Sequence, residues 1–252
     1  MELKGKSMKI IDSHCHLGVS KLSGRTITES DLLQAMDAHG VDISLAMPHA
    51  VTDDPVAEHD AVANMCQRHP ERFRGMVNLS PLWDEADYHH EATRCVRELG
   101  FVALKLNPMQ HLTSPLMTNA NKVFDAAADL GVPVIVHTGL GVPWALPALS
   151  IPQARRHPDL PIVLGHAGFA VYTPEAYVAA VECNNIYLEP SWCAIYELKW
   201  LIQELGVDRI LFGSDLPENL PVELVKYKSL NLPPEDLVTC LGGTAARLFQ
   251  IY

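Results

Sequence analysis

Polar side chains that can bind a metal or move a proton follow most of the short apolar runs in this sequence. They are Asp12, His14, His16, Lys105, His137, His166, Glu189 and Asp215. One histidine at the end of a strand is usually a satisfied polar residue, but repetition at the ends of separate runs indicates a shared site. The remaining histidines fall in helix-length or loop segments, and most are expected at the surface: His39, His49, His59, His69, His89, His90, His111 and His157.

The segment "DSHCHLG" places two histidines one residue apart. In an extended chain residues i and i+2 point the same way, so His14 and His16 are expected to share one face while Cys15 packs on the other. Together with His137 and Asp215 from other strands, these imidazoles suit Zn²⁺ or another first-row divalent ion better than Ca²⁺ or Mg²⁺. Such a set leaves room for a water that becomes hydroxide near neutral pH.

The elements that must position these residues alternate between short apolar runs and longer segments of mixed pattern. Eight strands are expected, at "KIID", "ISLAMP", "RGMVNL", "FVALKL", "PVIVH", "PIVLGH", "NIYLEP" and "RILFGSD". Among the helix-length segments between them, "TESDLLQAMDAHG" carries a cap at Thr28 or Ser30 and a stop at Gly40. Continuous apolar strands that alternate with helices indicate a parallel sheet covered by helices.

Eight strand–helix units in 252 residues predict an α/β fold, a single (β/α)8 TIM barrel whose one domain spans residues 1–252. The alternative, a doubly wound open sheet, would favour a GxGxxG turn after a strand, and the sequence contains none. In a TIM barrel the chemistry lies at the carboxyl ends of the strands. The polar residues fall at that end.

Composition and charge exclude several classes of protein. Hydrophobic residues make up 48% and charged residues 19% of the chain, which is typical of a folded core. The net charge of −11 argues against a general nucleic-acid binder, and no apolar run approaches the roughly 20 residues of a membrane span. Six cysteines without a CxxC pair indicate free thiols, and "MELKGKSMKI" lacks the apolar core of a signal peptide. We expect a soluble cytoplasmic protein that acts on a small molecule, without nucleic-acid or membrane partners.

The segments "DSHCHLG", "LKLNP", "VHTG", "LGHAG" and "FGSDLP", with the closing "LGGTAARLF", resemble the amidohydrolase superfamily. The resemblance is closest to its amidohydrolase-related (amidohydrolase 2) branch of TIM-barrel metal-dependent hydrolases and nonoxidative decarboxylases, and it covers essentially the whole chain. It implies one metal ion per chain, held by the ligands His14, His16, His137 and Asp215. TatD-type nucleases share "DSHCHL" but usually carry a glutamate at the position of Lys105, which counts against that relationship.

The resemblance also implies roles for two further residues. His166 matches a histidine that is a ligand in two-metal relatives and more often an acid–base group in the one-metal branch. Lys105 matches a position where some members carry a carboxylated lysine that bridges two metals. The pattern "LKLNP" favours an uncarboxylated lysine near the substrate.

Two reactions fit this set of residues. We expect hydrolysis of a small ester, lactone or amide by a metal-activated water, with Asp215 or His166 as the acid–base group. The alternative is a nonoxidative decarboxylase or hydratase of an aromatic or unsaturated carboxylic acid, which needs cations and an apolar wall at the barrel mouth. Candidate substrate-binding residues in the loops after the strands are Lys21, Arg25, Trp144, Phe169 and Trp192.

A third alternative, a binding or regulatory protein built on a degenerate barrel, would show a broken ligand set. Every ligand position is filled here, which argues against it. The loops after the strands are short, and short loops indicate a small substrate or a pocket completed by a partner chain. A homodimer is therefore an open alternative to a monomer.

Overall fold

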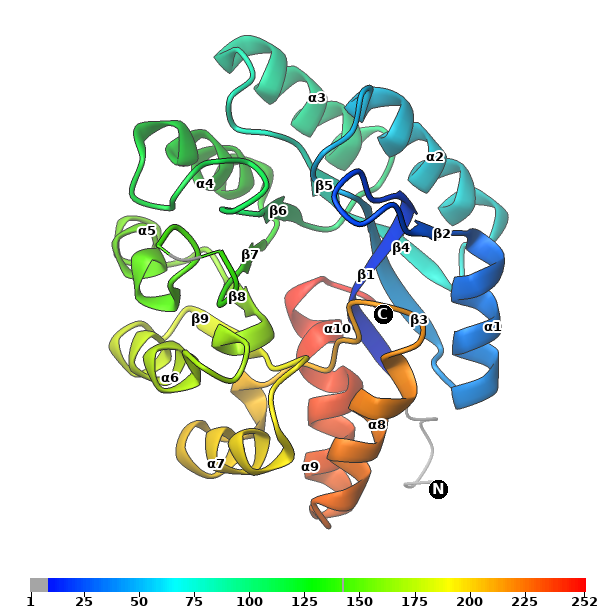
Figure 1. Cartoon of the computed structure of the whole chain (residues 1–252), viewed down its shortest axis with the longest axis vertical. Helices are drawn as coiled ribbons and strands as arrows, with labels where there is room; N and C mark the ends of the chain where they lie inside the picture. Colours follow the sequence, from blue (N-terminus) through cyan, green and yellow to red (C-terminus); the bar gives the residue numbers. More distant parts are fainter. Residues whose placement is uncertain (1–8, 142) are drawn as a thin grey trace.

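The computed structural model describes residues 9–141 and 143–252, so most of the amino-terminal segment considered above lies outside the described residues. The chain forms a (β/α)8 barrel in which the helices surround a ring of strands (Figure 1). Within the described part of the chain, no helix combines the length and the apolar character needed to cross a bilayer.

The strands form two sheets that together make the ring. The first has the order β2-β1-β3-β4, with β1 at Ile11–Val19, β2 at Thr26–Ile27, β3 at Ile43–Pro48 and β4 at Phe73–Gly75. The second runs in chain order through β5 at Val77–Asn78, β6 at Leu104–Leu106, β7 at Val134–His137, β8 at Ile162–Gly165 and β9 at Ile186–Glu189. All pairs are parallel except the β1–β2 hairpin, so the strand ends that carry polar residues meet at one end of the barrel.

Two of the eight expected strands differ from the prediction. The third is split around Met76, whose N–H donates to the Ala46 carbonyl, so that β4 pairs with β3 while β5 pairs with β6. The eighth is an extended segment that pairs with its neighbouring strands through the isolated parallel bridges Leu188↔Ile210 and Cys15↔Asp215 rather than through a continuous ladder. Its successive N–H groups bond to different partners, including the Leu188 carbonyl and the Asp12 side chain, which interrupts a regular ladder.

The helices lie outside the strands and end where the sequence indicates. They are α1 (Glu29–His39), α2 (Pro55–Arg68), α3 (Glu85–Arg97), α4 (Thr118–Leu130), α5 (Ile151–Arg156), α6 (Thr173–Glu182), α7 (Ile195–Leu205), α8 (Leu220–Ser229), α9 (Pro234–Val238) and α10 (Thr244–Leu248). The side chain of Thr28 accepts from the Asp31 N–H at the start of α1, and Gly40 ends it with a φ of 71°. Thr28 rather than Ser30 is therefore the cap.

Apolar side chains fill the barrel as well as the layer between strands and helices. Those inside are Ile11, Ile43, Leu45, Met47, Met76, Ala103, Ile135, Val163 and Leu211, joined by Ala245, Leu248, Phe249 and Ile251 from the C-terminal segment. That segment closes the amino end of the strands, because Gly242 lies so near the start of β1 that a Cβ there would be 2.0 Å from the Lys9 oxygen. Leu104 and Leu106 belong to the outer layer, so Lys105 points into the barrel.

Candidate active site

Strand β1 carries the two histidines of the "HCH" segment on one face. The Cys15 thiol lies against the Leu45 carbonyl oxygen in the outer layer, so Cys15 faces away from His14 and His16 as expected. Asp12 accepts hydrogen bonds from the N–H groups of His14, at 3.2 Å, and Ser214, at 2.9 Å. Burial raises the pKa of Asp12 to about 7, although these hydrogen bonds act to lower it. Asp12 thereby ties β1 to the segment that carries Asp215.

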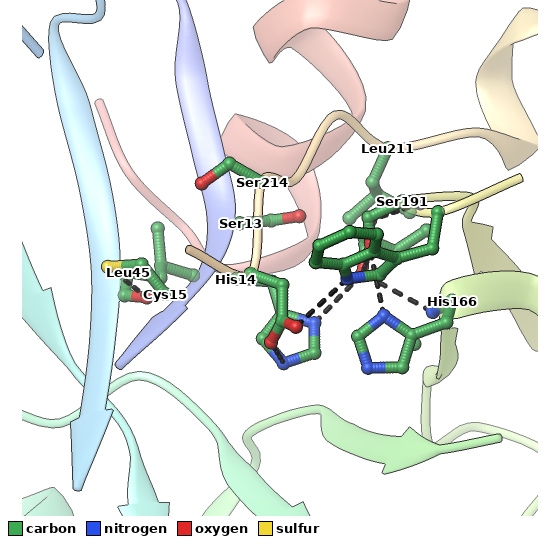
Figure 2. A network of polar contacts seen from close by, with 12 residues as sticks. Ser13, His14, Cys15, Leu45, His166, Ser191, Leu211 and Ser214 are labelled. Carbon is green, nitrogen blue, oxygen red and sulfur yellow. Dashed lines mark hydrogen bonds and ion pairs between the residues drawn. The ribbon is translucent and has the colours of Figure 1, made fainter. Parts of the chain in front are cut away.

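His14 is the centre of the polar cluster and is fully buried. Its Nδ1 lies 2.8 Å from Glu189 Oε2, and its Nε2 lies 2.8 Å from Lys105 Nζ. The centroids of the His14 and His166 rings are 4.8 Å apart. Figure 2 shows the two rings side by side. When His14 Nδ1–H donates to Glu189, the Nε2 lone pair remains available to Lys105 or to a metal ion.

Glu189, at the end of β9, supports this cluster although the predicted site omits it. Its Oε1 accepts from the Ser191 N–H at 2.8 Å, while Oε2 accepts from the Ser191 hydroxyl at 3.2 Å and contacts His14. Burial raises the pKa of Glu189 to about 7, opposed by the hydrogen bonds from Ser191. The signal for it was present in the sequence, since "YLEP" ends a strand as the other site segments do.

Asp215 completes a group of possible ligand atoms. Its Oδ1 lies 3.6 Å from His14 Nε2 and 3.4 Å from His16 Nε2, and its Oδ2 accepts from the Trp192 indole N–H at 2.9 Å. Burial raises the pKa of Asp215, but His166, His16 and His14 outweigh it and hold that pKa well below its usual range. Ligands about 2.0–2.1 Å from a tetrahedral ion lie about 3.4 Å apart, so this spacing fits a first-row divalent metal.

His166 and His137 lie beside this group rather than within it. The Nδ1 of His166 lies 2.7 Å from the Ser191 hydroxyl, and burial lowers the pKa of His166 well below its usual value. The His137 ring lies 4.8 Å from that of His166, but its Nε2 donates to the Leu140 carbonyl at 2.9 Å. Donor atoms that lie within 4.8 Å of one another form two groups at this end of the barrel, one of His14, His16 and Asp215 and one of His14, His166 and Glu189. His137 belongs to neither, so its ligand role stays a prediction.

Two of the three predicted aromatic residues border the cluster. The rings of Phe169 and Trp192 stack with centroids 5.8 Å apart and an interplanar angle of 16°, and Phe169 also meets His166 edge-on at 5.6 Å. Trp144 is half-buried in the loop after β7. The structure records no aromatic contact between Trp144 and this pair among the described residues.

Four residues of the site adopt a left-handed backbone that non-glycine residues rarely take. They are His166 (φ 66°), Phe169 (φ 54°), Trp192 (φ 66°) and Asp215 (φ 67°). Each such residue costs about 1–3 kcal/mol, and this strain persists only where the surroundings enforce it. The sequence carries no sign of it, since none of the four is glycine or asparagine.

The cations of the predicted substrate site differ in their placement. Lys105 is buried, and burial lowers its pKa to about 8, opposed by Asp215 and Glu189. The side chain of Arg25 is 45% exposed and pairs with Glu218. Lys21 is also exposed and pairs with Asp53. The structure therefore places Lys105 inside the cluster. Arg25 and Lys21 instead lie in the loop after β1, where each forms an ion pair with an acidic side chain.

Six of the eight histidines expected mostly at the surface are partly or fully buried: His49, His59, His69, His89, His111 and His157. His49 is half-buried and stacks on His16 with a centroid separation of 4.8 Å. His59 lies in the helix layer against Glu91, and His111 is 2% exposed in the loop after β6. Their positions depend on packing between elements, which the helix or loop context of each residue does not reveal.

Comparison with known proteins identifies similar chains of nearly the same extent. The family model described as "Amidohydrolase" matches residues 11–251. A gamma-resorcylate decarboxylase from Rhizobium radiobacter is 27% identical over 87% of this chain and 86% of its own. A 2-keto-4-carboxy-3-hexenedioate hydratase from Sphingobium sp. (strain NBRC 103272 / SYK-6) is 29% identical over 76% of this chain and 70% of its own.

A solved structure shares the fold. The dihydroxybenzoic acid decarboxylase from Polaromonas sp. JS666, with bound manganese and the inhibitor 2-nitroresorcinol, superposes with a TM-score of 0.73. It is 19% identical and covers 97% of this chain and 98% of its own. The predicted hydrolase activity is wrong, because the relatives that match most of this chain are named decarboxylases. The resemblance to the amidohydrolase superfamily covers hydrolases and nonoxidative decarboxylases alike, so the histidine and aspartate motifs do not separate the two reactions.

Proposed function

The chain belongs to the amidohydrolase family, and we propose that it is a metal-dependent, nonoxidative decarboxylase of a hydroxy-substituted aromatic carboxylic acid. The observation that carries the proposal is the stacked pair of Phe169 and Trp192 against a buried cluster of histidines, Asp215 and Lys105. Stacked aromatic side chains favour a flat ring, and the buried cation favours its carboxylate. The decarboxylase relative from Rhizobium radiobacter supports the same reaction.

We propose that His14, His16 and Asp215 hold one divalent transition ion, with His137 and His166 as further candidates. When bound, such an ion supplies a Lewis acid beside the substrate oxygens. Imidazole and carboxylate ligands suit zinc, and the manganese in the Polaromonas structure makes manganese an equal candidate. Reconstitution of metal-free protein with each ion in turn, followed by elemental analysis, distinguishes the two.

The aromatic and cationic residues orient the substrate. Phe169 and Trp192 hold the ring, while Trp192 also fixes Asp215 through its indole N–H. Lys105, inside the barrel and 2.8 Å from His14 Nε2, offers a positive charge to the carboxylate. Its burial strengthens this attraction, because the local dielectric constant is lower than that of water.

Asp215 is the proposed proton carrier. Loss of CO₂ requires a proton on the ring carbon that bears the carboxylate, because the electron pair of the broken bond must otherwise remain on that carbon. Asp215 is anionic, so it accepts the proton of an ortho hydroxyl and returns it to that carbon. The carbon–carbon bond then breaks, its electron pair passes through the ring to the hydroxyl oxygen, CO₂ leaves, and the phenolate takes a proton from solvent.

An unsaturated acid with several carboxylates is a second candidate substrate, favoured by the similarity to the hydratase from Sphingobium. Hydration of this substrate adds water across the carbon–carbon double bond and releases no CO₂. Zinc- and manganese-loaded protein should therefore be tested against hydroxybenzoates and unsaturated polycarboxylates that carry a labelled carboxyl group. Labelled CO₂ from a hydroxybenzoate supports the decarboxylase. Loss of alkene absorbance without CO₂ supports the hydratase and overturns the first proposal.

A further inference from the structure

The turn that follows β6 fixes the ring of His111. The His111 N–H donates to the Asn107 carbonyl at 2.8 Å, and the Asn107 N–H donates to His111 Nδ1 at 3.2 Å. The hydroxyl of Thr113 donates to the His111 carbonyl at 2.9 Å, and its N–H donates to the Pro108 carbonyl at 3.0 Å. Backbone and side-chain bonds thus hold the imidazole in one orientation.

These contacts also determine which ring nitrogen of His111 carries the proton. A backbone N–H can only donate, so Nδ1 is the acceptor and keeps its lone pair. Burial, together with the nearby charge of Lys105, lowers the pKa of His111 to about 3, so the ring is neutral at neutral pH. The proton of the neutral ring therefore lies on Nε2. A protonated Nε2 cannot bind a metal ion, which leaves it as a hydrogen-bond donor.

This donor is buried without a partner. His111 is 2% exposed, and its Nε2 has no hydrogen-bond partner among residues 9–141 and 143–252. An unpaired buried donor costs about 1–3 kcal/mol, and native proteins retain few of them. Lys105 points into the barrel two residues before this turn begins, and its charge reaches the His111 ring. The unpaired donor therefore lies at the same end of the barrel as the candidate site.

We propose that His111 is a substrate-binding residue whose Nε2–H donates a hydrogen bond to an oxygen of the aromatic carboxylic acid. This inference rests on the proposed function and adds a specificity residue to it. A carboxylate or hydroxyl oxygen is the acceptor that satisfies the donor, and a neutral imidazole binds it without adding charge. Lys105 and His111 would then contact the substrate from the same strand and the loop that follows it.

Two variants separate the donor from the rest of the ring. His111→Asn keeps an amide oxygen near the position of Nδ1, as an acceptor for the Asn107 N–H, and removes the Nε2 donor. His111→Gln carries an amide N–H near the position of Nε2 and restores the donor. Binding of 2,6-dihydroxybenzoate to manganese-loaded protein is measured by calorimetry, and thermal melting checks that each variant folds.

We expect His111→Asn to bind the acid about tenfold to a hundredfold more weakly than wild type, with at least part of this loss recovered in His111→Gln. Heteronuclear NMR should show the His111 proton on Nε2 and a shift of its signal when the acid is added. A proton on Nδ1, or equal affinity of wild type and His111→Asn, overturns the inference.

The same experiment separates this inference from the proposed function. If wild type releases CO₂ while His111→Asn binds normally, the inference fails and the decarboxylase stands. If wild type binds the acid and releases no CO₂ while His111→Asn binds weakly, the decarboxylase fails and the contact stands. If wild type binds neither 2,6-dihydroxybenzoate nor any other hydroxybenzoate of the panel, both are overturned.

Discussion

Two buried histidine–glutamate pairs in this barrel have the same contact distance and opposite surroundings. In the helix layer, His59 Nδ1 lies 2.8 Å from Glu91 Oε1, and at the barrel mouth His14 Nδ1 lies 2.8 Å from Glu189 Oε2. Arg94 donates to both carboxylate oxygens of Glu91, at 2.7 and 2.9 Å. Burial raises the pKa of both glutamates, but hydrogen bonds from His59 and Arg94 reverse this for Glu91 and lower its pKa to about 2. The pKa of Glu189 rises to about 7.

The difference shows that spacing alone does not mark an active site. His59, Glu91 and Cys95 also lie close enough together to hold a metal. Yet both nitrogens of His59 are used, because its Nε2 accepts the Asn78 N–H at 3.1 Å. The pair at the mouth instead leaves the Nε2 lone pair of His14 directed at other polar groups. We therefore infer that the first pair holds α2 and α3 against β5 and that the second serves the reaction.

The largest effect is expected from Asp215→Asn. This change removes a ligand charge and the proposed proton carrier together, so metal content should fall well below one ion per chain. CO₂ release should fall by about a hundredfold to ten-thousandfold. Elemental analysis and labelled CO₂ measure the two effects. Glu91→Gln is the matched control and should keep its metal. Full metal content and full activity in Asp215→Asn would contradict the roles of Asp215 as ligand and proton carrier.

A loss of stability without a loss of metal is expected from Glu91→Gln. The folded pKa of Glu91, about 2, lies below the ordinary value of 4.5, so its ionised form stabilises the fold. This contribution, up to about 3 kcal/mol, is present above pH 4.5 and is lost as the pH falls towards 2. Denaturant unfolding of wild type and Glu91→Gln at several pH values should show a difference in the free energy of unfolding that disappears in acid. A difference that does not change with pH would contradict this account of the pair.

A weaker metal site with a nearly unchanged fold is expected from Glu189→Gln. The amide still reaches His14 but accepts its proton less strongly, and loss of such a supporting carboxylate costs about tenfold to a hundredfold in metal affinity. Calorimetric titration with manganese or zinc measures this, with Glu91→Gln as the control. If Glu91→Gln lowered the metal affinity and Glu189→Gln did not, the roles assigned to the two pairs would be reversed.

The smallest effect is expected from Trp192→Phe. Phenylalanine keeps the stack on Phe169 and removes the indole N–H that donates to Asp215. One lost hydrogen bond to a charged group predicts a decrease in kcat/KM of about tenfold. Trp192→Ala, which also removes the stack, should raise KM further. Steady-state kinetics that show the same KM for both variants would argue against a ring held at this wall.

Much of this architecture could be predicted from the sequence, because hydrophobic period and capping act locally. The opposite facing of Cys15 and His14 follows from the two-residue period of a strand, and Gly40 ends α1 by its own backbone freedom. The break at Met76 could not be predicted, because the apolar run is continuous and only pairing with β3 and β6 divides it.

The remaining misses depend on contacts between distant segments. Arg25 is neutralised by Glu218, which lies in another loop, and the Nε2 of His111 is defined as a donor only by the Asn107 contact. The sequence predicts the wrong reaction because a set of metal ligands does not specify which bond breaks. The residues that surround the ligands determine the reaction. Among them, Phe169 and Trp192 have a strained, left-handed backbone that the sequence does not indicate.

The central claim is that the cluster around His14 and Asp215 releases CO₂ from a hydroxybenzoate. The most direct test incubates metal-reconstituted wild type and Asp215→Asn with 2,6-dihydroxybenzoate labelled at its carboxyl carbon and collects the gas. The account predicts labelled CO₂ and an equal amount of resorcinol from wild type, with almost none from Asp215→Asn. Unchanged acid with metal-loaded wild type, across the whole hydroxybenzoate panel, would contradict it.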